Sequence, residues 1–272
     1  MKYFRFFLPK PTLLTSALTF ITLTIITQVG GVIYLLSWLI SKQIKIEFKF
    51  KHSITFLGLY LIFTFSIIPY VAPFYGREKV KNTRQIRPVS YISIVLNRNY
   101  IKPELNNFLS EVEKNLQGTS IKITYLDANF PFIDKFSLFP HLSHNDGKKI
   151  DLSLIYEDES GKVSEKQKSI SGYGIFENPQ ENEFNQIKKC LDFGYFQYDY
   201  PKYLTLGKVN SNLTFSEVGT KQLVDAILKV HGLGKLFIEP HLKQRLGLRN
   251  SKVRYHGCRA VRHDDHIHLQ LL

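Results

Sequence analysis

The sequence predicts an α+β fold with a small, mainly antiparallel sheet and flanking helices, preceded by two transmembrane helices. Two long uncharged stretches lie in the first third of the 272-residue chain. Beyond them, alternating apolar patterns typical of strands are interspersed with helical patterns, but the two kinds do not alternate regularly. A regular alternation would favour a parallel sheet covered by helices on both faces, so we expect the α+β class.

The two uncharged stretches cover residues 11–40 and 53–76. Each is longer than the roughly 20 apolar residues that a helix needs to cross a bilayer. Two other interpretations exist. The first stretch could be a cleaved signal peptide, although a signal core is only about 7–15 residues long, and the pair could form a buried helical hairpin. We expect residues 1–76 to form a membrane anchor with two transmembrane helices in the lipid bilayer.

A basic linker is expected over residues 77–88 and a globular domain over residues 89–272. Within the domain, period-two alternation and turn residues predict strands at 89–97, 120–127, 148–158, 235–240, 252–256 and the C-terminal end. Helical spacing of apolar residues and helix-stop signals predict helices at 102–118, 181–192, 215–231 and, as a single turn, 241–246. These elements fit a small sheet with flanking helices.

The charge balance indicates the surroundings of the domain. The chain holds 36 basic and 23 acidic residues; seven of the basic and one of the acidic residues lie in 1–76, which leaves a net charge of +7 for the remainder. This moderate excess suits a polyanionic neighbourhood such as a cell wall or a lipid surface. No long Lys/Arg stripe with interleaved aromatic residues is present, which argues against nucleic acid as a partner.

The chain has two cysteines, Cys190 and Cys258. They could form a disulfide in an oxidising compartment, or they could remain two buried thiols. The sequence leaves both possibilities open. Neither cysteine has the spacing of a cysteine-based zinc site.

The last predicted strand carries histidines on one face. In "HDDHIHLQL", Ile267, Leu269 and Leu271 share one face, and His266 and His268 share the other. An apolar face opposite two histidines indicates a strand that packs on a core and borders a cleft. This arrangement is typical of a metal site.

A second group of metal-ligand residues lies upstream in the pattern H-x2-H-x6-D, formed by His141, His144 and Asp151. Asp151 opens a predicted strand, and Gly147 allows the loop before it to turn tightly. Two histidines and one carboxylate suit zinc, and a catalytic zinc site leaves its fourth position to water. H-x6-D together with the downstream H-x-H therefore predicts a zinc site.

These paired motifs resemble the signature of the LAS zinc peptidases, a group that includes lysostaphin-type peptidases, D-alanyl-D-alanine peptidases and the hedgehog fold. The ending "HDDHIHLQL" is most similar to that of the penicillin-insensitive murein endopeptidases. "SHNDGKKIDL" resembles their ligand loop, although Lys149 stands where that loop has a carboxylate. The resemblance covers the two motif blocks within 120–272, and leaves out the membrane segments and the stretch 160–215.

The resemblance implies a fold like that of the hedgehog domain and the D-alanyl-D-alanine peptidases, with three zinc ligands and one catalytic residue. The ligands would be His144, Asp151 and His268. His266, the first histidine of H-x-H, would be the catalytic base or would stabilise the transition state. Since His266 and His268 share a strand face, one can bind the metal while the other reaches a water.

Five further residues around these motifs are candidates for supporting roles. The resemblance implies that His141 and His263 contact the zinc ligands or the substrate. Asp264 and Asp265 are either turn residues or acceptors for the free N–H of a histidine, which would fix its tautomer. Arg262 either binds a substrate carboxylate or belongs to a solvated basic rim.

The expected function is hydrolysis of peptide bonds in peptidoglycan, in which zinc polarises the scissile carbonyl and activates a water. One alternative is a D,D- or L,D-carboxypeptidase of the same fold. Another is a non-catalytic zinc-binding interaction module, whose metal would be closed by four protein ligands and would not need a free His266.

The expected substrate and the charges disagree on membrane topology. Positive charges on the side of the chain termini outnumber the four lysines of the 41–52 loop, which would indicate a cytoplasmic domain. A peptidoglycan substrate requires the domain on the extracytoplasmic side of a bacterial inner membrane. We expect the extracytoplasmic location, because charge counts this similar orient a helix pair only weakly.

Overall fold

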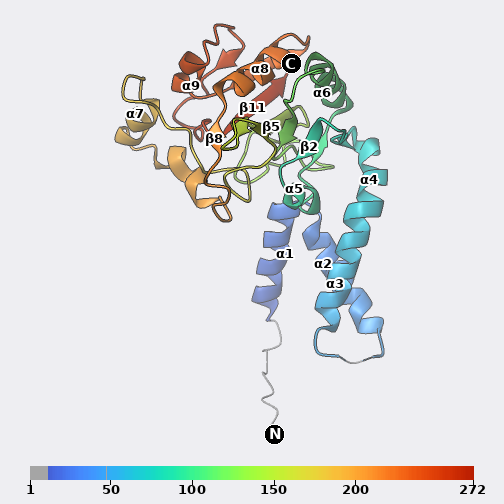
Figure 1. Cartoon of the computed structure of the whole chain (residues 1–272). Coiled ribbons are helices and arrows are strands. Elements are labelled where there is room, and N and C mark those ends of the chain that lie inside the picture. Colours follow the sequence, from blue (N-terminus) through green and yellow to red (C-terminus); the bar gives the residue numbers. More distant parts are fainter. Residues whose placement is uncertain (1–11, 47) are drawn as a thin grey trace. The chain divides into compact units, whose positions relative to one another are not determined.

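The computed structural model describes residues 12–46 and 48–272. The chain divides into two compact units, one ending at Tyr70 and the other spanning Val71–Leu272 (Figure 1). The first eleven residues, which the predicted anchor includes, and residue 47 lie outside the described part.

The first unit is helical. Its first two helices are α1 (Leu13–Thr27) and α2 (Gly30–Gln43). A continuous helical stretch follows, formed by α3 (Lys51–Ile62), the π-helical η1 (Phe63–Ile67) and α4 (Ile68–Val71). It continues into the second unit as the 3-10 helix η2 (Ala72–Tyr75). This stretch, Lys51–Tyr75, has 25 residues, and its length and apolar composition would allow it to cross a membrane.

The prediction of a single transmembrane helix over 11–40 is wrong. The chain breaks at Gln28, whose φ of 67° is left-handed, so that α1 and α2 are separate helices of 15 and 14 residues. Both are shorter than the roughly 20 residues needed to span a bilayer. The Thr27 hydroxyl accepts the N–H of Gly30 at 2.8 Å, and a side chain on Gly31 would overlap Thr24. Hydropathy reports the composition of the stretch, but these contacts decide where it bends.

The second unit contains a six-stranded sheet in the order β10-β9-β11-β5-β4-β2. In that order the strands are Val253–Arg254, Leu233–Phe237, His266–Leu271, Lys149–Ser153, Ile123–Tyr125 and Ile86–Pro88. The three central pairings are antiparallel and the two outer ones are parallel. The predicted α+β class with a mainly antiparallel sheet is confirmed.

Besides η2, the second unit contains two smaller sheets and six further helices. The small sheets pair β1 (Glu78–Lys79) with β3 (Tyr100–Ile101), and β6 (Tyr156–Glu157) with β7 (Val163–Ser164) and β8 (Thr214–Phe215). The helices are α5 (Tyr91–Val95), α6 (Pro103–Asn115), α7 (Gln186–Asp192), the 3-10 helix η3 (Phe196–Tyr203), α8 (Glu217–Leu228) and α9 (Pro240–Arg245).

Two predictions for the start of the domain are corrected. The strand expected over 89–97 contains the short helix α5, which Ser90 caps by accepting the Ile92 N–H at 3.2 Å. The linker expected over 77–88 instead contains β1 and β2, and β2 pairs with β4 in the main sheet. β2 has only three residues, which is too short to show the apolar alternation of a strand. The basic residues around it therefore determined the prediction of a linker.

The core lies on one face of the main sheet. Ile267 and Leu269 of β11 are fully buried in one cluster with residues of α6 and α8. The helical spacing expected over 102–118 is confirmed, since its apolar side chains are all buried in that cluster. His266 and His268 point away from this core on the other face of β11, which leaves that face free to carry polar side chains.

Candidate metal centre

Strand register brings the two histidine motifs together. β11 pairs with β5 in antiparallel register so that His268 lies opposite Asp151 and His266 lies opposite Ser153. Opposite residues of an antiparallel pair project from the same face. His144 reaches this face from the loop before β5, which Gly147 turns at φ 78°.

Three ligand atoms converge at this point. The Nε2 of His144 lies 3.1 Å from Oδ1 of Asp151 and 3.0 Å from Nδ1 of His268. The same Nδ1 lies 2.8 Å from Oδ1 of Asp151. All three side chains are buried. A tetrahedral zinc ion with ligands at 2.0–2.1 Å would hold its donors about 3.3 Å apart, close to this spacing.

Hydrogen bonding indicates which nitrogen of His144 is available to a metal. The Nδ1 of His144 lies 2.5 Å from the carbonyl oxygen of Ala128, and a carbonyl can only accept, so the ring carries its proton on Nδ1. In the neutral ring, Nε2 is then the nitrogen that can give a lone pair to a metal, and it lies 3.1 Å from Oδ1 of Asp151. Two such donor atoms at this spacing fit a metal ion.

The second oxygen of Asp151 has its own partners. Oδ2 accepts a hydrogen bond from the Tyr173 hydroxyl at 2.8 Å and lies 3.2 Å from Nδ1 of His141. The buried group His141, His144 and Asp151 could hold a metal ion, since its ligand atoms lie within 4.8 Å of one another. His268 is the better-placed candidate for a third ligand, because its Nδ1 faces the same carboxylate oxygen as His144 does.

The surroundings set the protonation of the cluster. Burial opposes ionisation of Asp151, but His144, His266 and His141 hold the pKa of its carboxyl well below the usual value. Burial lowers the pKa of His268 to about 4 and that of His141 well below its usual value. At neutral pH Asp151 is therefore charged, and His268 and His141 are neutral and able to donate lone pairs to a metal.

His266 has the surroundings of a base. Its Nδ1 lies 2.5 Å from Oδ1 of Asp265, whose Oδ2 accepts the Gly174 N–H at 2.6 Å. Its buried Nε2 has no hydrogen-bond partner among the described residues and lies 3.8 Å from Oδ2 of Asp151. Burial opposes its charge, but Asp151 and Asp265 raise the pKa of His266 to about 9. Of the two interpretations of Asp265, the structure supports the one in which it fixes a histidine tautomer.

Arg262 has a different place from the one expected, whereas Asp264 lies in the bend before β11, which fits its interpretation as a turn residue. Arg262 is 4% exposed. Its guanidinium donates to Asp264 at 2.7 Å, to Asp199 at 3.1 Å and to Asn178 at 2.8 Å. Every nitrogen of that guanidinium donates to a partner within the protein, so Arg262 lies in the interior and not on a solvated rim. The pair instead fixes the chain just before β11.

His263 lies beside His266, the candidate base. Its ring centroid is 4.8 Å from that of His266, and its backbone N–H donates to Glu239 at 2.9 Å. Burial, followed by the neighbouring His266 and His268, lowers the pKa of His263 well below its usual value. His263 is therefore a neutral ring at the edge of the cluster.

Sequence reasoning missed Tyr173, which contacts the cluster from the stretch 160–215. The available signal was an aromatic residue between two glycines, Gly172 and Gly174, which indicates a tight turn. Nothing in a single sequence connects that turn with Asp151, because they meet only through the tertiary fold.

A cavity of about 630 Å³ borders the cluster and is lined by His141, His263 and His268. Phe139, Leu142, Phe196 and Tyr200 contribute apolar walls, and Arg259 is the one Lys or Arg among its lining residues. A substrate in this cavity would therefore lie against the candidate metal ligands, with a single cation available for a carboxylate.

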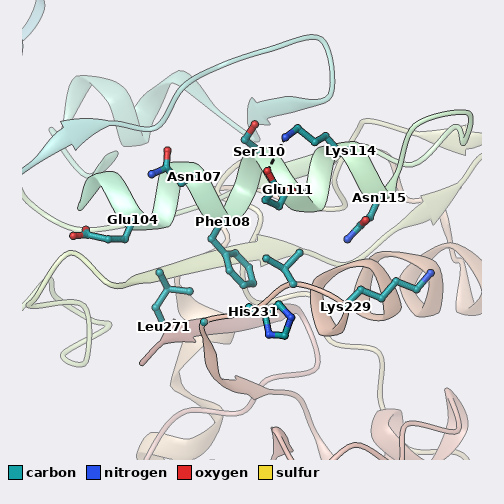
Figure 2. Close-up of a pocket in the computed structure, with 12 residues that line it drawn as sticks. Glu104, Asn107, Phe108, Ser110, Glu111, Lys114, Asn115, Lys229, His231 and Leu271 are labelled. Carbon is teal, nitrogen blue, oxygen red and sulfur yellow. Dashed lines mark hydrogen bonds and ion pairs between the residues drawn. The ribbon is translucent and has the colours of Figure 1, made fainter.

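A second cavity of about 700 Å³ lies beside α6 and the end of α8 (Figure 2). Glu111, Lys114 and His231 line it, together with Leu271. Leu271 belongs to the apolar face of β11, so this cavity lies on the other side of the sheet from His268. Its Glu111–Lys114 pair, 2.6 Å apart, is exposed. This cavity is separate from the metal cluster.

A disulfide joins Cys190 and Cys258, which decides between the two possibilities left open by the sequence. It links α7 to the chain just before Arg259 and so connects α7 to a wall of the cavity beside the cluster. The Tyr255 hydroxyl lies 3.0 Å from the sulfur of Cys190.

Comparisons with known proteins name no family for this chain. No protein-family model matches it, and no curated protein is significantly similar to it. The functional assignment therefore depends on the geometry of the cluster and on the resemblance of its motifs to those of zinc peptidases.

Proposed function

We propose that the protein is a membrane-anchored zinc peptidase of the LAS type that hydrolyses peptide bonds in peptidoglycan. The observation that supports this proposal most strongly is the arrangement of His144, Asp151 and His268 around one point, next to the unpartnered Nε2 of His266. A purely structural zinc site needs no base beside its ligands, whereas a hydrolytic site does.

Zinc, when bound by His144, Asp151 and His268, supplies a Lewis acid that activates water and polarises a carbonyl. A cation held there would oppose a proton on Nε2 of His266 and so would lower the pKa of this ring from about 9, which favours the neutral form that a base needs. Nε2 can then take a proton from the attacking water and pass it to the leaving amine. The Asp265 carboxylate holds the Nδ1 proton and stabilises the imidazolium that forms.

The disulfide supports an extracytoplasmic location for the domain. Disulfides persist in oxidising compartments and are rare in the cytosol. The Cys190–Cys258 bond therefore favours the side of the membrane where peptidoglycan lies, against the weak preference indicated by the flanking charges. The helical stretch Lys51–Tyr75 would anchor the chain in the bilayer.

Two other functions are each supported by one observation. A carboxypeptidase needs a cation for the terminal carboxylate of its substrate, and Arg259 in the cavity wall meets that need. A non-catalytic zinc module needs a fourth protein ligand, and His141 is the nearest residue that could provide it.

Product analysis distinguishes these functions. The full chain, purified in detergent and loaded with zinc, would be incubated with peptidoglycan, and the released fragments identified by mass spectrometry. Endopeptidase activity converts crosslinked muropeptides into uncrosslinked ones, whereas carboxypeptidase activity releases single amino acids. His266→Ala should abolish either product, and His231→Ala, which changes an exposed histidine at the second cavity, should not. A zinc-loaded chain that releases nothing from any peptidoglycan would contradict the proposal and favour the binding module.

A further inference from the structure

The two carboxylate oxygens of Asp151 have separate partners. Oδ1 faces Nε2 of His144 and Nδ1 of His268. Oδ2 accepts the hydroxyl hydrogen of Tyr173 at 2.8 Å and has Nδ1 of His141 at 3.2 Å. Tyr173 is buried, and its ring centroid lies 4.6 Å from that of His141. Oδ1 is therefore directed at the metal position, and Oδ2 is held away from it.

The turn that carries Tyr173 has a backbone that only glycine fits on either side. Gly172 and Gly174 have φ values of 84° and 79°, in the left-handed region. A side chain on Gly172 would overlap Leu126, and one on Gly174 would overlap the carbonyl oxygen of Pro201. The position of the Tyr173 side chain is thus fixed by the backbone around it.

The same turn also supports the candidate base. Ser169 donates its hydroxyl hydrogen to the Tyr173 carbonyl at 2.7 Å. The next residue, Gly174, donates its N–H to Asp265, which in turn contacts His266. Consecutive residues of one turn therefore hold a carboxylate of the metal cluster and the carboxylate that orients the base.

We propose that Tyr173 is a positioning residue that holds Asp151 as a one-oxygen metal ligand. The inference depends on the metal site of the proposed function, but not on peptidase activity. A carboxylate can bind a metal through one oxygen or through both. If Oδ2 of Asp151 were free to turn toward the ion, it would occupy the coordination position that a catalytic site leaves to water. The Tyr173 hydrogen bond prevents this.

The test compares Tyr173→Phe with Tyr100→Phe in the full chain in detergent. Tyr100 is also fully buried, but its hydroxyl has no hydrogen-bond partner among the described residues. Tyr173→Phe should weaken zinc binding, measured by competition with a chelator, by about 10–100-fold, the usual effect of removing a partner of a metal ligand. Tyr100→Phe should leave the affinity unchanged.

With cobalt in place of zinc, the absorption spectrum of the metal can be measured, and a loss of packing alone would not change it. The visible absorption of Co²⁺ weakens as its coordination number rises, so Tyr173→Phe should show a weaker band if Asp151 then binds through both oxygens. Should Tyr173→Phe not fold, Ser169→Ala loosens the same turn and should change affinity and spectrum in the same direction. Parental zinc affinity, or a parental cobalt spectrum, in a folded Tyr173→Phe protein would overturn the proposal.

Discussion

Replacing Asp265 with asparagine should impose the wrong tautomer on the candidate base. Oδ2 of Asp265 accepts the Gly174 N–H at 2.6 Å, and Oδ1 lies 2.5 Å from Nδ1 of His266. The Gly174 amide can only donate, so the asparagine side chain must direct its oxygen there and its NH₂ group at His266. Nδ1 of that ring must then accept, which moves its proton to Nε2, the atom that has to take a proton from water.

The size of the effect follows from the alternative orientation of the new side-chain amide. If that amide flipped, it would restore the working tautomer but leave the buried Gly174 N–H facing another donor, which costs about 1–3 kcal/mol. This cost alone reduces the working fraction by about 5–150-fold. Loss of the charge that stabilises protonated His266 lowers the rate further. We therefore expect the decrease in turnover to approach the about 10²–10⁴-fold that a general base contributes. Zinc content should not change, because Asp265 does not contact the ligand atoms.

Two measurements test this reasoning. Nitrogen-15 NMR of the histidine rings, with His266 assigned by its absence in His266→Ala, reports which nitrogen carries the proton and needs no substrate. Turnover of Asp265→Asn should be no higher than that of Asp265→Ala, which removes the tautomer bias without imposing the wrong one. Asp225→Asn, at an exposed ion pair, is the surface control. A proton on Nδ1 of His266 in zinc-loaded Asp265→Asn would refute the argument.

Three further predictions concern the metal, the topology and pH. His268→Ala should lose zinc and activity together, whereas His266→Ala should keep zinc and lose turnover by about 10²–10⁴-fold. Metal analysis and muropeptide release, measured on both variants, test this. Parental turnover in His266→Ala would show that another residue is the base. A reporter active only in the cytoplasm, fused after Leu272, should stay inactive, and its activity would contradict the extracytoplasmic location. Glu183, whose pKa is lowered to about 2 by its hydrogen bonds from Arg245, should stabilise the fold by about 1–3 kcal/mol at pH 7. Thermal unfolding should show Glu183→Gln to be less stable than the parent above about pH 4.5. The difference should disappear as pH falls toward 2, because a lowered folded-state pKa gives stability only where the carboxyl is ionised. A difference that persists at pH 2 would show that it does not come from ionisation.

The parts of the site that the sequence could predict are those set by local periodicity. Alternation alone separates Ile267 and Leu269 from His266 and His268, and β11 has that arrangement because the side-chain period of a strand is two. Alternation could not predict that H-x-H lies next to H-x6-D, because strand register depends on two segments that are distant in the sequence. That prediction depended on the motif resemblance. The structure pairs His268 with Asp151 across that register.

Charge and hydropathy predicted less, because they do not identify partners or bends. The basic residues around Arg262 in the sequence suggest a solvated rim, but its guanidinium donates to Asp264, Asp199 and Asn178. The stretch 11–40 has the hydropathy of one long helix but divides at a left-handed Gln28. The partners Asp199 and Asn178 are distant from Arg262 in the sequence, and the bend at Gln28 depends on contacts between individual side chains that mean hydropathy does not describe.

The contribution of Tyr173 shows where a motif stops describing a metal site. The two motif blocks place Asp151, His266 and His268 on adjacent strands, and strand geometry keeps their backbones in register. Strand geometry does not decide which oxygen of Asp151 faces the ion or which nitrogen of His266 keeps its proton. Both are decided by hydrogen bonds from residues 173 and 174, in a turn without any motif. The motifs can therefore position a metal, while the chemistry that the metal supports depends on a segment to which they give no clue.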